Sequence, residues 1–363
     1  MKQKTIFTFL ALSALIITSC GTQKNQKSDY RKINGEAQGT TYHITYKDEK
    51  KVNYAESVDS IFKAIDNSVS FYVENSTLTK FNNCDSICDI DEHFFKVLWK
   101  SFEVYYNTNG NLDPTVKPLI DFWGFGGKEI KIFDVVDSSQ IDSLMQFVGL
   151  EKIKFYDSEK QSVIEFDPTK NIRYTPNIKV LKTNPKIQLD FNAIAQGYTV
   201  DVISEFFLSK GIQDFLVEVG GEVRVNGKNP KGTDWTIGID KPIEDEMKRE
   251  IQAVIKLQNE AVATSGNYRK FIEKNGMKYS HTIDARTGYP VHHNLLSATI
   301  VAKDATTADG YATACMVMGL AKTKEFLKSH PELKTYLIYS DEQGNFQTYL
   351  SPDLEDKIRE LEQ

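Results

Sequence analysis

The sequence lacks the features that define several large classes of protein. Its 44 Lys and Arg are outnumbered by 50 Asp and Glu, for a formal charge of −6. A nucleic-acid-binding surface needs excess basic side chains to displace phosphate counterions, so the composition argues against a nucleic-acid partner. Four cysteines among 363 residues are too few for a disulfide scaffold. No GxGxxG or GxxxxGK[ST] motif is present, which excludes the two standard phosphate-binding loops.

Long apolar runs are also scarce. No segment reaches the roughly 18 apolar residues of a membrane-spanning helix. The run from Ile6 to Ile17 follows Lys2 and Lys4 and, at about 12 residues, is typical of the apolar part of a signal peptide. It ends in Ile-Thr-Ser-Cys, which resembles the lipobox of bacterial lipoproteins and makes Cys20 the candidate for lipidation. The alternative is an ordinary signal peptide in which this cysteine is incidental.

The lipobox interpretation divides the chain into three parts. We expect residues 1–19 to be a signal peptide that is cleaved before Cys20. Residues 20–31 are mostly polar and are expected to form a flexible tether, and residues 32–363 are expected to form one folded domain. The mature protein is then predicted to be anchored by lipid to a membrane of the bacterial cell envelope and to face the periplasm.

Helical and strand patterns are mixed along the rest of the chain. Helices are predicted at 58–69, 92–106, 138–149, 306–319 and 321–329. A short strand at 187–191 is predicted to lead into a further helix that ends at about residue 209. Further strands are predicted at 151–157, 162–167, 215–221, 222–227, 234–240, 250–258 and 295–302, and in a hairpin over 334–350. Strands that adjoin hairpin turns pair antiparallel. The pattern therefore predicts an α+β fold with mixed, mainly antiparallel sheets and packed helices.

Two of the cysteines leave an alternative open. Cys84 and Cys88 lie four residues apart, and an exported protein meets oxidising conditions, so they either pair or remain free thiols. Cys315 lies in an Ala-rich helical pattern and is expected to be a small core residue.

Several stretches carry more charge, amide groups and glycine than ordinary turns need. Residues 190–198 lead from a strand into a helix, whose first N–H groups can bind an anion. Asp309 and Thr313 lie one helical turn apart, so their oxygens share a face and suit Mg²⁺, although such a pair alone is more typical of a cap and a packing residue. His281 stands close to Asp284, and an acid and a base in one turn favour a functional site over a structural histidine. The residues alone predict a metal-assisted site for an anionic, phosphate-bearing ligand.

Seven stretches occur in an order that resembles one known family. They read GTTYHITY, DPTVKPLIDFWGFG, DFNAIAQGYTVD, LVEVGGEVRVNGKNPKG, ATSGNYRKF, SHTIDARTGYPV and ADGYATA. The family is ApbE, the exported FAD:protein FMN transferases. The resemblance implies an enzyme that splits the pyrophosphate of FAD, moves the FMN half onto a Thr or Ser hydroxyl of a target protein, and releases AMP.

The resemblance also implies roles for individual residues. Contacts with the flavin nucleotide fall on Gln38, Tyr72, Asn111, Leu112, Asp113, Asp190, Gln196 and His281. The Mg²⁺ ligands fall on the carbonyl of Ala193 and on the side chains of Asp309 and Thr313. The target hydroxyl needs a base, for which His281 is the candidate, with Asp284 as the alternative or as its orienting partner. FAD, Mg²⁺ and membrane or exported redox proteins are the implied partners.

Three positions depart from the family pattern. Gln38 stands where the family usually has Met, Gln196 replaces the usual Lys, and Ala285 replaces a common Pro. The missing Lys removes a cation near the phosphates, so we expect an altered affinity for FAD. Two alternatives remain, namely Mg²⁺-dependent hydrolysis of FAD to FMN and AMP, and a lipoprotein that binds FAD without turnover. The intact metal pair and His281 favour an enzyme.

Overall fold

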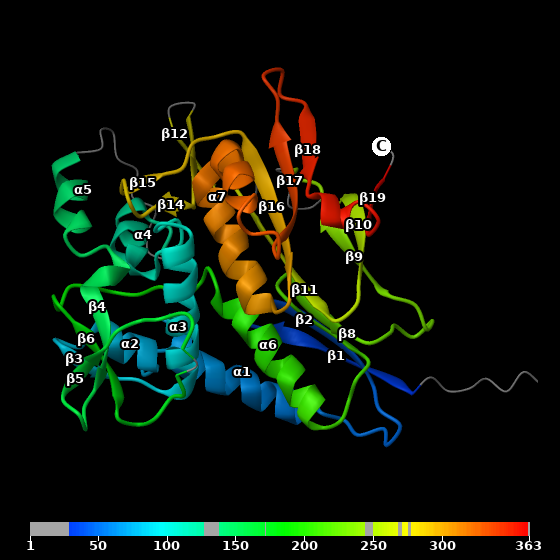
Figure 1. The fold of residues 1–363 in the computed structure, drawn as a ribbon, viewed down its shortest axis with the longest axis horizontal. Coiled ribbons are helices and arrows are strands. Elements are labelled where there is room, and N and C mark those ends of the chain that lie inside the picture. The colour runs from blue at the N-terminus through cyan, green and yellow to red at the C-terminus, as the bar shows by residue number, and fades with distance from the viewer. Residues whose placement is uncertain are drawn as a thin grey trace, which may run out of the picture.

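An antiparallel sheet of eight strands forms the centre of the fold (Figure 1). The computed structural model describes residues 29–126, 138–170, 172–243, 250–267, 271–274 and 277–361. Neighbouring strands pair antiparallel in the order β1-β2-β7-β8-β11-β16-β17-β18. Their bounds, in that order, are Tyr30–Ala37, Thr40–Lys47, Phe215–Val219, Glu222–Asn226, Glu260–Gly266, Leu295–Ala302, Lys334–Ser340 and Phe346–Leu350. The last two residues of the predicted tether, 30 and 31, thus begin β1.

Helices cover one face of this sheet and a small sheet covers the other. The helices are α1 (Ala55–Val69), α6 (Ala195–Ser209) and α7 (Ala305–Leu327). Apolar side chains of α6, such as Phe207, pack against β2 and β7. The small sheet contains β9 (Trp235–Asp240), β10 (Ile251–Leu257) and β19 (Ile358–Glu360). Its buried residues meet Val225, Val262 and Ile338 of the large sheet, so alternate residues of these strands are buried on opposite faces.

A second unit of sheet and helix packs beside α7. Its strands are β3 (Ile87–Asp89), β6 (Ile178–Lys182), β4 (Ile153–Asp157) and β5 (Ser162–Ile164), in that order. Helices α2 (Thr77–Asn82) and α3 (Glu92–Asn107) lie against them, with aromatic contacts such as Trp99–Phe155 at 5.2 Å between ring centroids. The remaining elements are α4 (Lys117–Trp123), α5 (Ser138–Met145), β12 (Phe271–Lys274), β13 (Met277–Ser280), β14 (Ile283–Asp284), β15 (Tyr289–Pro290), η1 (Pro114–Val116), η2 (Leu150–Lys152) and η3 (Pro352–Leu354).

The α+β prediction is confirmed, and a few local predictions are wrong. Residues 187–190 join no sheet. The break predicted between helices 306–319 and 321–329 is confirmed, because the backbone of α7 leaves the helical conformation at Gly319 (φ 74°, ψ 173°) and the second helical part ends at Leu327. The carbonyls of Cys315 and Met316 near the kink accept hydrogen bonds from Thr323 Oγ1 at 3.1 Å and from His293 Nε2 at 2.7 Å. The helix predicted over 138–149 ends at Met145.

The cysteine alternatives are resolved. Cys84 and Cys88 form a disulfide that closes the loop between α2 and β3. Cys315 is fully buried, as expected for a core residue.

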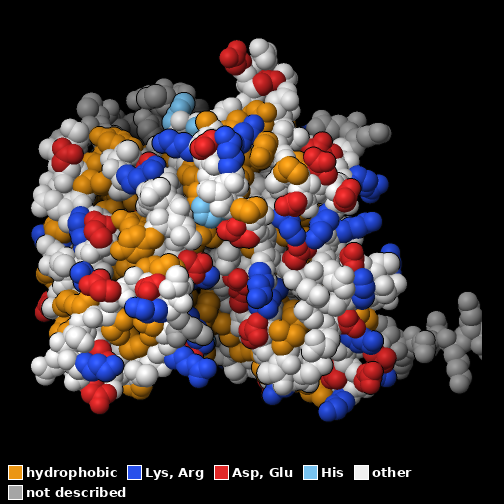
Figure 2. Space-filling model, in the orientation of Figure 1, with side chains coloured by type: hydrophobic (Ala, Val, Ile, Leu, Met, Phe, Trp, Pro, Cys, Tyr) orange, Lys and Arg blue, Asp and Glu red, His pale blue; other side chains and the backbone are white. Residues whose placement is uncertain are grey.

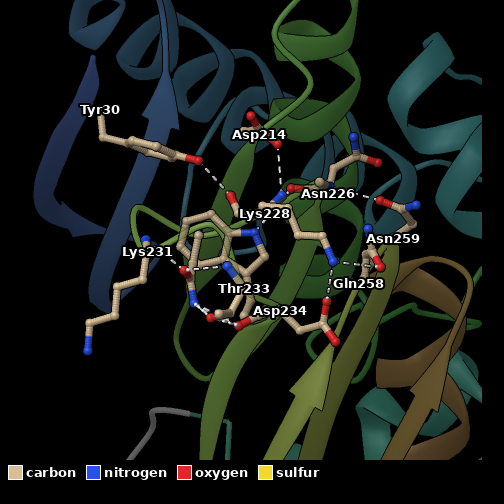
Figure 3. A network of polar contacts seen from close by, with 12 residues as sticks. Tyr30, Asp214, Asn226, Lys228, Lys231, Thr233, Asp234, Gln258 and Asn259 are labelled. Carbon is tan, nitrogen blue, oxygen red and sulfur yellow. Dashed lines mark hydrogen bonds and ion pairs between the residues drawn. The ribbon is translucent and has the colours of Figure 1, made fainter. Parts of the chain in front are cut away.

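The turn between β8 and β9 is held by a dense polar network (Figure 3). The Lys228 N–H donates to Asp214 Oδ1 at 2.8 Å, the Lys228 ammonium contacts Asp234 at 2.8 Å, and the Tyr30 hydroxyl donates to the Lys228 carbonyl at 2.7 Å. The register pairs Phe215 with Asn226 here, at the opposite end of β7 and β8 from their own turn at Gly220. The motif NGKNPKG is therefore a structural turn at the far end of these strands.

No membrane-spanning helix is found in the part of the chain that the structure describes, and the one face seen in Figure 2 carries no continuous basic patch. Within that part, no helix is both long enough and apolar enough to cross a bilayer. On the face shown in Figure 2, Lys and Arg side chains of the described residues are interspersed with Asp and Glu and form no continuous basic patch.

Candidate functional site

The first turn of α6 lies against α7 at Asp309, one of the predicted metal ligands. The Gly197 N–H donates to Asp309 Oδ2 at 3.0 Å, which joins α6 to α7. A Cβ placed on Gly197 would lie 2.4 Å from the Ala305 carbonyl oxygen and 2.7 Å from the Asp309 Cβ. Only glycine therefore allows the two helices to approach closely enough for this hydrogen bond.

Two hairpin turns of the large sheet rest on the same part of α6. Gly220, in the β7–β8 turn, has φ +67°, and a Cβ there would lie 2.9 Å from Gln196 Nε2. In the β1–β2 turn, Gln38 Nε2 donates to Thr199 Oγ1 at 3.0 Å and to Asp66 Oδ1 at 3.1 Å. Gln38 Oε1 is buried and has no hydrogen-bond partner among the described residues. The structure thus brings Gln38, Gln196 and Asp309 together around α6.

Three of the amide groups predicted to bind an anion at this helix end donate to acceptors within the protein. The Ala195 N–H donates to the Phe191 carbonyl at 2.9 Å, and the Tyr198 N–H donates to the Ile194 carbonyl at 3.1 Å. The Gly197 N–H is taken by Asp309. These three N–H groups are therefore already engaged, which leaves fewer donors at this helix end for an anionic ligand.

The electrostatics around Asp309 favour a cation. Asp309 is buried, and burial raises the pKa of its carboxyl well above the ordinary value. The charge of buried Glu222, the first residue of β8, raises this pKa further, whereas the Gly197 N–H lowers it. A bound cation offsets the electrostatic repulsion between two buried carboxylates. Sequence reasoning missed Glu222, whose only signal was its place directly after the glycine pair of the β7–β8 turn.

The other predicted metal ligands lie close to Asp309 in the chain or on α6. Thr313 lies one turn farther along α7 and is half-buried, and Ala193, also half-buried, precedes α6 by two residues. Within the described ranges, no group of three or more His, Cys, Asp or Glu side chains is placed to hold a metal ion. A metal here would depend on hydroxyl, carbonyl and ligand oxygens beside the carboxylate, which is a set typical of Mg²⁺.

Asp190 lies in the segment that leads into α6 and is joined to the loop before α4. Its N–H donates to the Pro114 carbonyl at 2.8 Å. Asp190 Oδ1 accepts from the Asn192 N–H at 2.7 Å, whereas Oδ2 is buried with no hydrogen-bond partner in the described part of the chain. Burial raises the pKa of Asp190 to about 6, against the lowering effects of the Asn192 N–H and the Lys117 charge. A buried carboxylate with one oxygen that lacks a hydrogen-bond partner is suited to accept a hydrogen bond from a ligand.

The three predicted residues of the loop before α4 have different surroundings. Asn111 Nδ2 donates to the Thr108 carbonyl at 2.5 Å, and its buried Oδ1 has no partner among the described residues. Leu112 packs in the hydrophobic core. Asp113 Oδ1 accepts from both the N–H and the hydroxyl of Thr115, at 2.8 and 2.6 Å. Asn111 therefore has a side-chain oxygen left for a ligand, whereas Leu112 and Asp113 shape the loop.

Tyr72 lies next to these two segments through Phe71. Its side chain is 70% exposed, and its ring centroid is 4.0 Å from that of Phe71. The ammonium of Lys117 lies 4.9 Å from the Phe71 centroid and 2.5 Å from Asp121 Oδ1. Phe71 thus joins Tyr72 to Lys117, the first residue of α4, and the Asp190 N–H is bonded to Pro114 just before that helix. An exposed aromatic ring there is available to stack on a planar ligand.

The turn that follows β14 contacts the Asn111 loop. Asp284 accepts from Arg286 Nε at 2.8 Å and from Nη2 at 2.7 Å, an arrangement that fixes the guanidinium. Arg286 Cδ lies 3.8 Å from a Cβ placed on Gly110, so this turn packs on the loop. His281 is half-buried between β13 and β14. Asp284 holds the Arg286 guanidinium in place through these two hydrogen bonds. His281 is therefore the better candidate for the base. Cys20 lies outside the described residues.

Comparison with known proteins gives one family and one activity. The model of the ApbE family matches residues 38–337. A protein of Haemophilus influenzae named FAD:protein FMN transferase is 31% identical over 349 residues, covering 94% of this chain and 95% of that protein. One of Escherichia coli K12 with the same name is 29% identical over 357 residues, covering 95% and 96%.

Solved structures with the same fold carry related names. The flavin transferase ApbE from Vibrio cholerae superposes with a TM-score of 0.75 at 28% identity and covers 90% of this chain and 99% of its own. The ApbE protein from Thermotoga maritima gives a TM-score of 0.75 at 27% identity, with coverage of 90% and 99%.

Proposed function

The chain belongs to the ApbE family, and we propose that it is an FAD:protein FMN transferase that moves the FMN half of FAD onto a Thr or Ser hydroxyl and releases AMP. The observation that carries the proposal is the pair of vacant buried oxygens, Asn111 Oδ1 and Asp190 Oδ2, in two joined segments. Buried acceptors without partners destabilise the folded state unless a ligand supplies donors. The ring N–H and ribityl hydroxyls of a flavin are such donors.

The donor set around Asp309 fits Mg²⁺. Asp309, the Thr313 hydroxyl and the Ala193 carbonyl would hold the ion, and the charge of Glu222 strengthens the preference for a cation. When bound, Mg²⁺ neutralises the pyrophosphate and the negative charge that develops on AMP. This requirement is stronger in this chain because Gln196 supplies no positive charge and the N–H groups of Ala195, Gly197 and Tyr198 already donate within the protein.

The remaining steps belong to side chains of this chain. His281 accepts the proton of the target hydroxyl as its oxygen forms a bond to the FMN phosphorus. The bond between that phosphorus and the bridging oxygen of AMP breaks, and AMP leaves with the electron pair. The Asp284–Arg286 pair keeps the turn after His281 against the Asn111 loop. Tyr72 stacks on the nucleotide and holds it in place during transfer.

Incubation with FAD and Mg²⁺, with and without a flavin-free envelope fraction of the native organism, tests the proposal. A fluorescent band that survives denaturing electrophoresis, together with free AMP, is the expected result. AMP and FMN in equal amounts without a labelled protein would indicate hydrolysis instead. Bound FAD with neither product would indicate a binding protein.

We further propose that the mature protein begins at a lipidated Cys20 and works at the periplasmic face of a membrane. The support is the Ile-Thr-Ser-Cys sequence after a short apolar run. A lipid anchor would place the enzyme beside membrane-bound or exported redox proteins, which we propose as its targets. Residues 32–363 would then act as the catalytic domain.

A further inference from the structure

We propose that Asn82, at the last turn of α2, is a positioning residue that holds the two flavin-binding segments in register. This inference rests on the proposed function. The Asn82 side chain makes both hydrogen bonds of a strand partner to one residue, because its Nδ2 donates to the Leu189 carbonyl at 3.0 Å and its Oδ1 accepts from the Leu189 N–H at 2.7 Å. Residues 187–190 belong to no sheet, so this amide takes the place of a neighbouring strand.

The residue that Asn82 holds is the one before Asp190. The Asp190 N–H bonds to the Pro114 carbonyl at 2.8 Å, which ties the same segment to the loop that contains Asn111. Asn82, Leu189, Asp190 and Pro114 therefore form a continuous chain of contacts. Its two ends are α2 and the loop with the vacant oxygens. If the Asn82 contacts are lost, Asp190 can turn toward solvent, where its carboxylate is better hydrated.

The other end of α2 is joined to the loop that contains Tyr72. Ser76 caps α2 by accepting from the Thr79 N–H at 3.0 Å, and its hydroxyl donates to the Ser70 carbonyl at 2.6 Å. The Thr79 hydroxyl donates to the Val73 carbonyl at 2.9 Å. Helix α2 thus connects the aromatic side of the site, at Tyr72, to its acidic side, at Asp190.

The C-terminal end of α2 is fixed from outside, so Asn82 has a firm support. The ammonium of buried Lys182 donates to the carbonyls of Phe81, Cys84 and Pro185 at 3.2, 2.8 and 2.9 Å. The Cys84–Cys88 disulfide closes the loop that follows. A side chain whose backbone is fixed on both sides can define the position of its partner closely.

Asn82→Ala tests the proposal, with Asn83→Ala as the matched control because Asn83 is exposed. We expect Asn82→Ala to raise the Kd for FAD about tenfold, or about 1.4 kcal/mol. The rate of FMN transfer at saturating FAD should stay within about threefold of the wild-type rate. The free energy of FAD binding then offsets the cost of ordering the segment that contains Asp190. Asn83→Ala should match the wild type. The Kd is measured by quenching of flavin fluorescence well below the thermal transition.

A merely structural role for Asn82 would lower the melting temperature and leave the Kd unchanged, and this outcome overturns the proposal. Should Asn82→Ala fail to fold, Asn82→Asp replaces it, because Asp keeps the acceptor for the Leu189 N–H but loses the donor to the Leu189 carbonyl. A wild-type Kd for FAD in Asn82→Asp would also overturn the proposal. Wild-type protein that binds FAD without transferring FMN refutes the proposed function and still allows this comparison. Wild-type protein that binds no FAD refutes both.

Discussion

Replacement of Asp190 by Asn should stabilise the flavin-free protein while weakening its affinity for FAD. Asp190 is 4% exposed, and burial raises its pKa from 3.8 to about 6. For an acid with a raised pKa, the folded state is disfavoured wherever the group ionises, so stability is greatest below pH 3.8 and falls as the pH rises through 6. The difference in pKa amounts to about 3 kcal/mol of unfolding free energy at pH 8. Asn removes this cost and keeps an oxygen for the Asn192 N–H.

Urea unfolding of the flavin-free protein measures this difference. Asp190→Asn should exceed the wild type by about 3 kcal/mol at pH 8, by about half of that at pH 5, and by almost nothing near pH 3.5. Asp142→Asn, on the exposed side of α5, is the control and should change stability by less than about 0.5 kcal/mol. The Kd for FAD should rise about 10- to 100-fold, because a charged acceptor is lost.

The essential result is that Asp190→Asn raises the free energy of unfolding while it weakens the affinity for FAD. A variant that is less stable than the wild type at every pH would mean that the carboxylate is a structural acceptor. A variant with unchanged affinity for FAD would mean that the vacant Oδ2 does not face the ligand. Either result refutes the reasoning that links the vacant oxygen to flavin binding.

Three further variants test the other assignments. His281→Asn should lower transfer at saturating FAD by about 10²–10⁴-fold with a much smaller change in Kd, and an unchanged rate would exclude the general base. Asp309→Asn keeps the contact with Gly197 but should abolish Mg²⁺-dependent turnover, so full activity at low Mg²⁺ would contradict the metal assignment. Cys20→Ala should move the protein from the membrane to the soluble fraction, and unaltered fractionation and mass would argue against a lipid anchor.

Much of the fold follows from local sequence patterns. Helix α1, helix α3 and the strands from Phe215 to Asn226 have the apolar periodicity and glycine punctuation that predict them. Residues 187–191 have the pattern of a strand, yet their partner is the side chain of Asn82, 107 residues earlier in the chain. No local pattern reports such a partner, and this is why the predicted strand is wrong.

The site could be predicted only in part for a similar reason. The residue types and their order indicate Asp190, Asn111 and Asp309, but burial decides which of their oxygens stay vacant. Asp113 carries the same carboxylate as Asp190, but it accepts both Thr115 donors at Oδ1 and also a hydrogen bond from the Leu150 backbone, which lowers its pKa against the larger, raising effect of burial. Glu222 acts on Asp309 through a turn of the sheet that brings β8 to α7. These relationships depend on tertiary packing, which sequence spacing does not record.

Mass spectrometry of the flavinylated target is the most direct test of whether this protein transfers FMN to a protein hydroxyl. The protein is incubated with Mg²⁺ and with FAD that carries a heavy oxygen isotope at the non-bridging phosphate oxygens of its FMN half. We expect one Thr or Ser of the target to gain the mass of FMN less one water, this adduct to contain the labelled phosphate, and unlabelled AMP to be released in equal amount. Labelled FMN in solution with an unmodified target, or an adduct that retains the AMP half, would contradict this expectation.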